Sequence, residues 1–227
     1  MMKNALRNLM MGSLVLVSQW AHASFQLETM TVILDAAEPR KVFSVKNTSN
    51  SPILLSTKLA DIEGGQALAK DVLISPPIIR IEPQESQQIN FVLKNGLKIT
   101  DEAILKVSFQ GIGAVKENAT KMPIRQDVAM LIVPSDMTVS QTPWDALKIV
   151  QSGSNLTLTN TGRQVIRLGP NMTVLPSNAS LGLGQFYLRP NESKTLPVTG
   201  KVDNVKINPL SRYGFKMQVE PLIKVEH

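Results

Sequence analysis

The residue types that carry most enzyme chemistry are scarce in this chain of 227 residues. It contains no cysteine, and its two histidines are His22, near the N-terminus, and His227, the last residue. A nucleophilic triad and a zinc site both need His or Cys side chains brought together from several segments. The carboxylates that a glycosidase would use as a pair fall in turn-like segments, where solvated charge is the ordinary explanation: Asp35, Glu38, Glu82 and Asp101. The sequence therefore predicts no enzymatic activity, no metal site and no cofactor.

Phosphate binding and nucleic-acid binding also find little support in the sequence. The stretch "GLGQF" (Gly182–Phe186) is a turn into a strand and lacks the lysine of a phosphate-binding loop. Nucleic-acid binding needs a basic stripe with interleaved aromatic residues. Here the basic residues are scattered, and aromatic residues make up only 4% of the chain. The positive charge fits solubility or an acidic or carboxylate-bearing partner, and no nucleic-acid partner is expected.

The N-terminal segment has the features of a secretory signal. Lys3 and Arg7 give it a basic start, Leu9–Val17 is apolar, and Ala21–Ala23 fits a cleavage site of the small-x-small type. The apolar run is too short for a stable membrane anchor, and no stop-transfer pattern follows it. We therefore expect a signal peptide over residues 1–23 that is cleaved on export.

Export and the lack of cysteine together favour one compartment. Loss of Lys3 and Arg7 with the signal peptide lowers the net charge from +6 to about +4. An exported chain without disulfides must be held by its hydrophobic core alone, which suits a bacterial periplasm better than a eukaryotic exterior. No later segment is apolar enough to span a bilayer. The sequence therefore predicts a periplasmic protein that does not insert into the membrane.

The stretch "LISPPIIRIEPQESQQINFVL" (Leu73–Leu93) indicates two strands and a turn. Proline cannot donate to a sheet ladder, so Pro76 and Pro77 must sit at a bulge, a kink or a strand start. The turn formers of Glu82–Ser86 separate Ile78–Ile81 from an alternating strand, whose buried positions are Ile89, Phe91 and Leu93. We therefore expect one bent hairpin that needs a sandwich around it.

Short alternating runs recur along the chain, separated by Gly, Pro, Asn, Asp and Ser. The first set is as many as one immunoglobulin-like sandwich requires: Leu27–Leu34, Lys41–Lys46, Ile53–Leu59, Val72–Ile81, Gln87–Leu93, Ala103–Ile112 and Met122–Val133. A Pro-containing hinge at Val133–Trp144 precedes a second set: Leu147–Val150, Asn155–Thr159, Val165–Leu168, Met172–Leu175, Gly184–Leu188, Lys194–Val198, Val205–Ile207 and Tyr213–Val219. We predict an all-β chain of two immunoglobulin-like domains, residues 24–136 and 137–227, with a cleft at their junction.

Several segments together carry a family resemblance. In the stretch quoted above, the residues that fit the family's pattern are Pro76, Pro77, Arg80, Glu82 and Pro83. Similar segments lie on both sides of it: "LETMTVILDAAEPRKVFSVKNTSNSPILL" (Leu27–Leu55), "EAILKVSFQGI" (Glu102–Ile112), "DVAMLIVPSDM" (Asp127–Met137), "LTLTNTGRQVIRLG" (Leu156–Gly169) and "FYLRPNESKTLPV" (Phe186–Val198). In this order and spacing they resemble the periplasmic pilus chaperones, the PapD-like family of the chaperone–usher pathway. The resemblance implies two immunoglobulin-like domains in an L-shaped (boomerang) arrangement, and a cis proline at Pro76 or Pro77 is a hypothesis.

The resemblance also implies a function. Pilus subunits of this pathway are incomplete immunoglobulin folds that expose an apolar groove. The chaperone fills the groove with an edge strand (donor-strand complementation), prevents aggregation of the subunits and delivers them to an outer-membrane usher. A gapless alignment of "TKMPIRQDVAMLIVP" (Thr120–Pro134) puts Thr120, Met122 and Ile124 at the groove-filling positions. The alternative, that Met122 and Ile124 are ordinary core residues of a short hairpin, stays open.

The chain departs from the family where well-studied members hold the subunit's C-terminal carboxylate. The resemblance places an arginine on the first strand and a lysine on the lending strand, but this chain has Thr31 and Ala129 there. Neither forms a charge-assisted bond. Arg125, Lys121 and Lys106 are the candidate replacements, and each has the alternative of being a solvated surface cation. A subunit end held by backbone N–H groups is a further alternative.

Glu102 matches a family acid near the domain junction, although the position of its usual arginine partner is occupied by Val133. Two other functions stay open. A pilus structural subunit or adhesin is usually one domain with a donor extension and often a disulfide, unlike this chain. A periplasmic immunoglobulin-like binding or scaffolding protein unrelated to pili is the other alternative.

Overall fold

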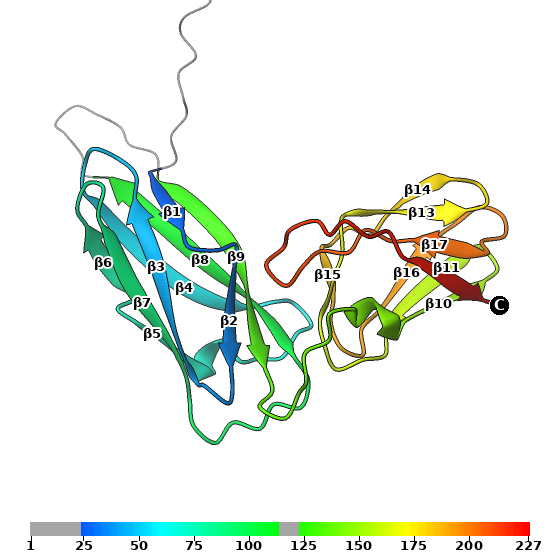
Figure 1. Cartoon of the computed structure of the whole chain (residues 1–227), viewed down its shortest axis with the longest axis horizontal. Coiled ribbons are helices and arrows are strands. Elements are labelled where there is room, and N and C mark those ends of the chain that lie inside the picture. Colours follow the sequence, from blue (N-terminus) through cyan, green and yellow to red (C-terminus); the bar gives the residue numbers. More distant parts are fainter. Residues whose placement is uncertain (1–23, 114–122) are drawn as a thin grey trace, which may run out of the picture.

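The structure of the protein, a computed structural model, describes residues 24–113 and 123–227 (Figure 1). The expected signal peptide lies outside the described residues. Within them the chain forms strands and two short 3-10 helices, η1 (Ala69–Asp71) and η2 (Pro143–Ala146). Neither of these helices has the length or apolar character needed to span a bilayer.

The first sandwich packs a four-stranded sheet, in the order β1–β3–β7–β5, against a five-stranded sheet, in the order β2–β9–β8–β4–β6. Its strands are β1 (Phe25–Leu27), β2 (Thr31–Asp35), β3 (Arg40–Asn47), β4 (Ile53–Asp61), β5 (Val72–Ser75), β6 (Ile78–Ile81), β7 (Ser86–Leu93), β8 (Ala103–Gly113) and β9 (Ile124–Val133). Three fully buried rings meet at its centre. Phe43 stacks on Phe109 with ring centroids 5.4 Å apart, and Phe91 meets Phe43 edge-on at 6.3 Å. Alternation along the strands directs these rings inward.

The second sandwich contains a seven-stranded sheet, in the order β14–β13–β17–β18–β10–β11–β16, and a separate pair, β12 and β15. Its strands are β10 (Leu147–Ser152), β11 (Asn155–Asn160), β12 (Ile166–Arg167), β13 (Asn171–Leu175), β14 (Ala179–Gly182), β15 (Tyr187–Leu188), β16 (Ser193–Pro197), β17 (Asn204–Lys206) and β18 (Leu222–Glu226). Leu158, Ile166 and Val205 are fully buried in its core. Both halves are therefore all-β sandwiches, as predicted.

The expected run Val72–Ile81 divides between the two sheets. β5 pairs with β7, whereas β6 pairs with β4 in the opposite sheet. The predicted hairpin between Ile78–Ile81 and the following strand is therefore wrong. Pro76 and Pro77 lie where the chain changes sheet, which fits their inability to donate to either ladder. The peptide bond between Ser75 and Pro76 is cis, so the cis-proline hypothesis is confirmed at Pro76.

The expected run Leu27–Leu34 divides in the same way. β1 pairs with β3 in the four-stranded sheet, and β2 pairs with β9 in the five-stranded sheet. Between them Met30 is 51% exposed. One apolar alternating run therefore serves both layers of the sandwich, and alternation alone does not show where a strand changes partner.

The second half differs from the prediction at four places. Tyr213–Val219, predicted as a strand, is a loop that begins with a tight turn, closed by a 2.8 Å hydrogen bond from Ser211 N–H to the Phe215 carbonyl. Of the run Gly184–Leu188 only its last two residues form a strand. Two strands were missed, β14 and β18. In the misplaced run, Tyr213 is 45% exposed and Phe215 is 63% exposed.

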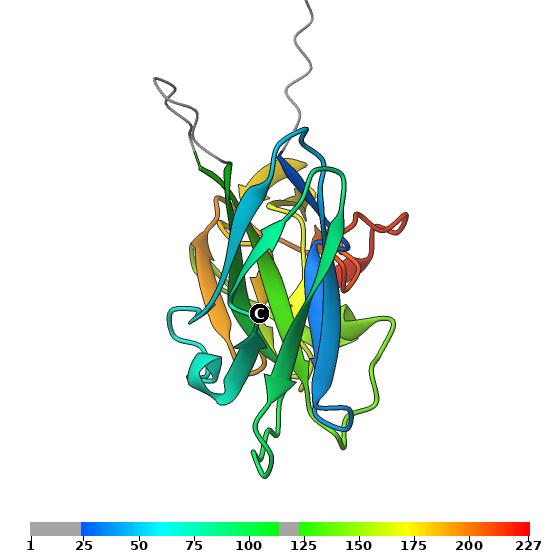
Figure 2. The same ribbon diagram turned by 90° about the vertical axis from the view of Figure 1, so that its left-hand side faces the viewer.

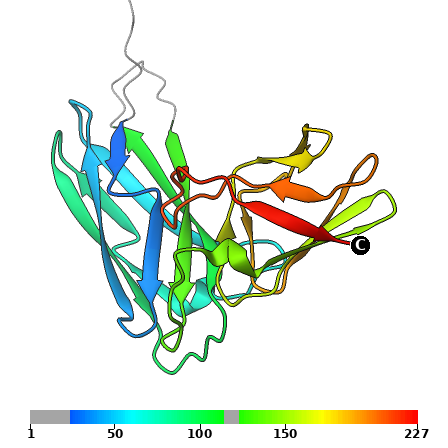
Figure 3. The ribbon, with the colours of Figure 1, turned by 45° about the vertical axis from the view of Figure 1, so that its right-hand side comes forward.

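The two sandwiches meet at an angle, so the molecule has an L shape (Figure 1, Figure 3). When the first sandwich faces the viewer, the second lies behind it (Figure 2). Residues 134–142 connect them without forming a strand. Ile104 and Leu131 of the first sandwich contact Val165 of the second in a small buried cluster. The junction therefore has an apolar contact of its own, separate from the two cores.

Candidate functional site

The strand β9 has different neighbours on its two edges. On one edge it pairs with β8 over nearly its whole length, from Ile124 opposite Gly111 to Ile132 opposite Ala103. On the other edge β2 covers only Ala129–Val133. Among the described residues, no strand pairs with the second edge of β9 at residues 124–128. This half of β9 therefore offers unpaired backbone donors and acceptors to an added strand.

The exposed edge exists because β1 belongs to the other sheet. The Phe25 ring lies over Gly111, where a Cβ atom would come within 2.7 Å of it. The Gln126 side-chain amide donates to the Phe25 carbonyl at 3.1 Å. These contacts hold β1 beside the open half of β9 without pairing its backbone to that half. No strand formed by residues 24–113 or 123–227 completes the sheet at this edge.

The structure places two of the sequence-predicted residues at this edge. Ile124 begins β9 and is half-buried, with part of its side chain against the first core. Arg125 follows it on the opposite, outward face. Three predicted residues, Thr120, Lys121 and Met122, lie outside the described residues. Pro123, the first described residue after them, is exposed and precedes the strand.

Arg125 is already engaged by an acid. Its Nε donates to Asp127 Oδ1 at 2.8 Å, and its Nη2 donates to Asp127 Oδ2 at 3.1 Å and to Ser108 Oγ at 2.9 Å. The Arg125 guanidinium holds the pKa of the Asp127 carboxyl below its ordinary value. A guanidinium that is held in this way is less available to a carboxylate from a partner.

Lys106 lies in the same cross-strand row as Thr31 and Ala129, the two positions at which the chain departs from the family's pattern. Thr31 is in register with Ala129, and Ala129 is in register with Lys106 across β2, β9 and β8. Residues in register on neighbouring strands project to the same face of a sheet. Lys106 is exposed and makes no ion pair within the described part of the chain. A cation therefore stands one strand away from Ala129 on the same face.

A shallow pocket of about 230 Å³ opens on this face beside β9. It is lined by three cations, Lys58, Lys106 and Arg125, together with Ser56, Ser108 and Gln110. The acid near these cations is Asp127, and its carboxylate is already paired with Arg125. The pocket therefore favours a negatively charged group.

Thr31 is covered by an arginine from the second sandwich. Arg167, in β12, donates from Nη1 to Thr31 Oγ1 at 3.3 Å and to the Arg212 carbonyl at 3.2 Å. Thr31 is only 1% exposed. Burial lowers the pKa of Arg167 below its ordinary value, against the opposing effect of Glu102. Arg167 was not predicted as a site residue. A strand of only two residues is too short for its alternation to indicate which face of the sheet the arginine side chain lies on.

Glu102 lies at the junction of the two sandwiches and is 1% exposed. Its Oε2 accepts from the Val165 backbone N–H at 2.8 Å, and its Oε1 accepts from Arg212 Nη2. Burial raises the pKa of Glu102, and Arg212 and the Val165 N–H oppose that rise. Although the family's usual arginine position holds Val133, the acid therefore has an arginine partner that comes from the second sandwich.

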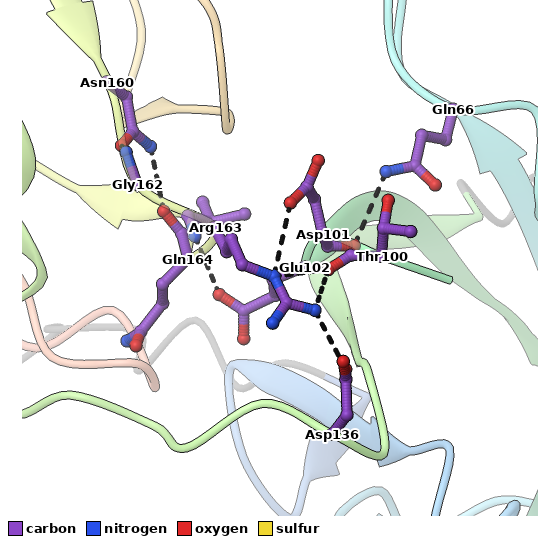
Figure 4. Close-up of polar contacts among 10 residues, drawn as sticks. Gln66, Thr100, Asp101, Glu102, Asp136, Asn160, Gly162, Arg163 and Gln164 are labelled. Carbon is purple, nitrogen blue, oxygen red and sulfur yellow. Dashed lines mark hydrogen bonds and ion pairs between the residues drawn. The ribbon is translucent and has the colours of Figure 1, made fainter. Parts of the chain in front are cut away.

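Further polar contacts surround this junction (Figure 4). Arg163 Nε donates to the Thr100 carbonyl at 2.8 Å, and Arg163 Nη2 donates to Asp136 Oδ1 at 2.8 Å. The Glu102 backbone N–H donates to the Arg163 carbonyl at 2.8 Å. Asp101 lies 3.6 Å from the same guanidinium. These bonds link both sandwiches and the connecting segment, so they oppose rotation at the junction.

The described residues contain no group of three or more His, Cys, Asp or Glu side chains that would hold a metal ion. The functional surface is instead a strand edge, a basic pocket beside it and a polar junction behind it. A sheet edge of this kind is where an added strand could pair with the backbone.

Comparison with known proteins gives the family. Residues 24–138, half of the chain, match the family model described as pili and flagellar-assembly chaperone, PapD N-terminal domain. The chain therefore belongs to this family of chaperones, and the resemblance found in its motifs is confirmed. A curated relative, the uncharacterized fimbrial chaperone YhcA of Escherichia coli (strain K12), is 28% identical over 194 residues, which cover 83% of this chain and 85% of the relative.

Solved structures show the same fold. A chain of the Salmonella enterica SafA pilin–SafB chaperone complex superposes with a TM-score of 0.74 at 20% identity, covering 89% of this chain and 97% of that chain. The E. coli chaperone DraB superposes with a TM-score of 0.73 at 17% identity, covering 90% of this chain and 98% of DraB. At these identities the likeness establishes the arrangement of two immunoglobulin-like sandwiches in an L.

Proposed function

We propose that this chain is exported to the periplasm, loses residues 1–23, and binds pilus or fimbrial subunits by lending them the start of β9. Residues 24–136 form the lending domain and residues 137–227 form the domain that closes the cleft. The bound subunit is protected from aggregation and passed to an outer-membrane usher. The proposal needs no cofactor and no catalytic residue.

The open edge of β9 at residues 124–128 is the observation that carries this proposal. An incomplete sandwich exposes an apolar groove between two unpaired strands. A lent strand supplies main-chain hydrogen bonds to both groove edges and apolar side chains to its floor. The fimbrial chaperone relative and the pilin complex of SafB and SafA support the same partner class.

The side chains proposed to fill the groove are Thr120, Met122 and Ile124. They are spaced by two, so in an extended segment they lie on one face. Ile124 touches its own core with part of its side chain, and the remainder of it is exposed at the edge. In the bound state Ile124 would therefore stand at the boundary between the chaperone core and the client groove.

The subunit's C-terminal carboxylate is proposed to meet Lys106 first. Lys106 has no acid partner within the described residues and lies in line with Thr31 and Ala129. Arg167, from the other sandwich, covers Thr31. A second cation therefore lies beside the cross-strand row that contains Lys106. Arg125 and Lys121 are the other candidates. Arg125 would have to exchange Asp127 for the subunit, which makes it the weaker one.

The test is co-expression of the tagged chain with the secreted proteins encoded beside its gene, followed by pull-down. The wild-type chain is expected to recover one or more of them as a soluble complex. Ile124→Asp places a charge on the floor of the client groove and is expected to reduce recovery to background, because an unpaired buried charge is costly. The matched control is Leu73→Asp, which changes a 61% exposed leucine on β5, the edge strand of the other sheet.

Each outcome bears on the proposal. Both variants are first checked for wild-type thermal unfolding, so that lost binding is not confused with lost fold. Recovery by the Leu73→Asp variant and not by the Ile124→Asp variant supports strand lending at β9. Equal recovery by both variants, or no recovered neighbour with the wild-type chain, would contradict it.

A further inference from the structure

We propose that a hairpin of the second sandwich, residues 210–216, is a second contact surface for the same client and packs on apolar residues that flank the client strand bound at β9. This inference rests on the proposed function. It gives the second sandwich a direct part in client recognition.

The hairpin is tight and well ordered by its own backbone. The Ser211 N–H donates to the Phe215 carbonyl at 2.8 Å, and the Gly214 N–H donates to the Ser211 carbonyl at 2.9 Å. Leu210 and Lys216 form a bridge at its base. Gly214 has a φ of +87°, a conformation that glycine adopts without strain. These bonds close the turn and place Tyr213 and Phe215 at its tip.

Two aromatic side chains at the tip face solvent. Tyr213 is 45% exposed and Phe215 is 63% exposed. Among the described residues, neither ring stacks on another aromatic ring. Aromatic residues are enriched in the buried centres of protein interfaces, where they bury a large area at low entropy cost. A hydrogen-bonded turn that presents two of them is suited to binding a partner.

The turn of the hairpin is tied to the first sandwich through Arg212. The Arg212 side chain donates to Glu102, and the Arg212 carbonyl accepts from Arg167, which also donates to Thr31. Thr31 is the first residue of β2 and therefore marks the end of the open edge of β9. Figure 1 and Figure 3 show the hairpin reaching from the second sandwich toward this end of β2.

The position of the hairpin indicates that its partner is the client bound at β9. A strand added along residues 124–128 of β9 cannot continue past Thr31, because β2 already occupies the edge from there on. The client backbone must leave the sheet beside the hairpin. Met30, which precedes Thr31 and is 51% exposed, adds apolar surface at the same point. The surface is thus continuous with the strand-lending edge, which favours the client over a second copy of this chain.

The experiment is a competition inside the cell. Wild-type and variant chains, each with a different tag, are co-expressed with the client identified by the pull-down above, and the ratio of client recovered on the two tags is measured. The variant is Tyr213→Ser with Phe215→Ser. We expect it to recover about tenfold less client than the wild-type chain, because loss of aromatic anchors commonly has at least that effect.

The control changes another exposed apolar residue of the second sandwich. Leu222, on β18, is 59% exposed, and Leu222→Ser is expected to share the client equally with the wild-type chain. Single Phe215→Ser, at a more exposed position, is the second variant if the double variant unfolds at a lower temperature. Its expected effect is a loss of client in the same direction.

The outcomes separate the two proposals. If the hairpin variants share the client equally with the wild-type chain and Ile124→Asp recovers none, the hairpin proposal is overturned and strand lending stands. If Ile124→Asp also recovers client normally, both proposals fail. If the hairpin variants share the client equally but change the oligomeric state in sedimentation, the surface serves a second copy, which also overturns the inference.

Discussion

The two halves of β9 differ although they form one continuous strand. From Ala129 to Val133 the strand lies between β2 and β8, and four of the five residues are buried. From Ile124 to Val128 it pairs with β8 alone, and only Val128 is buried. The register against β8 continues unchanged through both halves. The difference therefore comes entirely from the other edge, which β2 joins only at Thr31.

This difference shows how the fold keeps an open edge without losing stability. The covered half is part of the first core and also meets the second sandwich through Leu131 and Val165. The open half gains its order from β8 and from the strand continuing into the covered half. Long, exposed edges are aggregation hazards, and the described part of this open edge is five residues long, Ile124–Val128. The covered half of the same strand anchors this part in the first core.

The largest expected effect is a loss of stability when a buried side chain is shortened in the covered half of β9. Met130 is fully buried between β2 and β8, and Met130→Ala is expected to lower the free energy of unfolding by about 2–5 kcal/mol. Ile124→Ala, in the open half, removes a side chain that is already half exposed and is expected to cost about 1 kcal/mol. Urea denaturation of both variants measures the comparison.

A result in which Ile124→Ala costs as much as Met130→Ala would mean that the open half is an integral part of the core. The alternative reading of Ile124, as an ordinary core residue, would then hold. A result in which the two costs differ as expected leaves the open half free to act on a client.

Much of the first sandwich could be predicted because its pattern is local. Ile89, Phe91 and Leu93 alternate with polar residues, and all three are buried as that alternation predicts. The two proline positions also marked a real change of structure. The fold of β3, β4 and β8 follows from the same alternation, which depends only on residues that are neighbours in the chain.

The remainder could not be predicted because it depends on contacts that are distant in the chain. Whether β1 or β2 pairs with β9 depends on which sheet has a free edge. The alternation of the run that contains both strands does not indicate which of them does so. The partner of Glu102 is Arg212, 110 positions later, immediately before the run Tyr213–Val219 that was predicted to be a strand and is a loop. Likewise, Arg167 reaches Thr31 only through the angle between the sandwiches.

A smaller effect is expected for the cations beside the open half. Lys106→Ala removes a cation that has no ion pair within the described residues and is expected to weaken client recovery in the tagged competition about tenfold, the loss of one charge-assisted hydrogen bond. Arg125→Ala removes a cation that is already paired with Asp127 and is expected to change recovery less than about threefold. The reverse order would show that Arg125 leaves Asp127 to hold the client.

The smallest effect concerns the junction that backs the covered half. Burial raises the folded-state pKa of Glu102 above its unfolded value of about 4.3. Between those two values the folded chain binds more protons than the unfolded chain, so this group's contribution to stability increases as pH falls through that window. It decreases as pH rises through the same window, with a slope of at most about 1.4 kcal/mol per pH unit.

Glu102→Gln removes the titrating group and keeps an oxygen acceptor for the Val165 N–H. The free energy of unfolding of the wild-type chain minus that of this variant is therefore expected to increase as the pH is lowered from 7 toward 4.3. Urea denaturation at a series of pH values measures it. A difference that decreases over that range would mean that Arg212 outweighs burial and that the pKa of Glu102 is lowered. The contribution of Glu102 to the stability of the junction behind the covered half of β9 would then be larger at neutral pH than in acid. This is the opposite of what burial predicts.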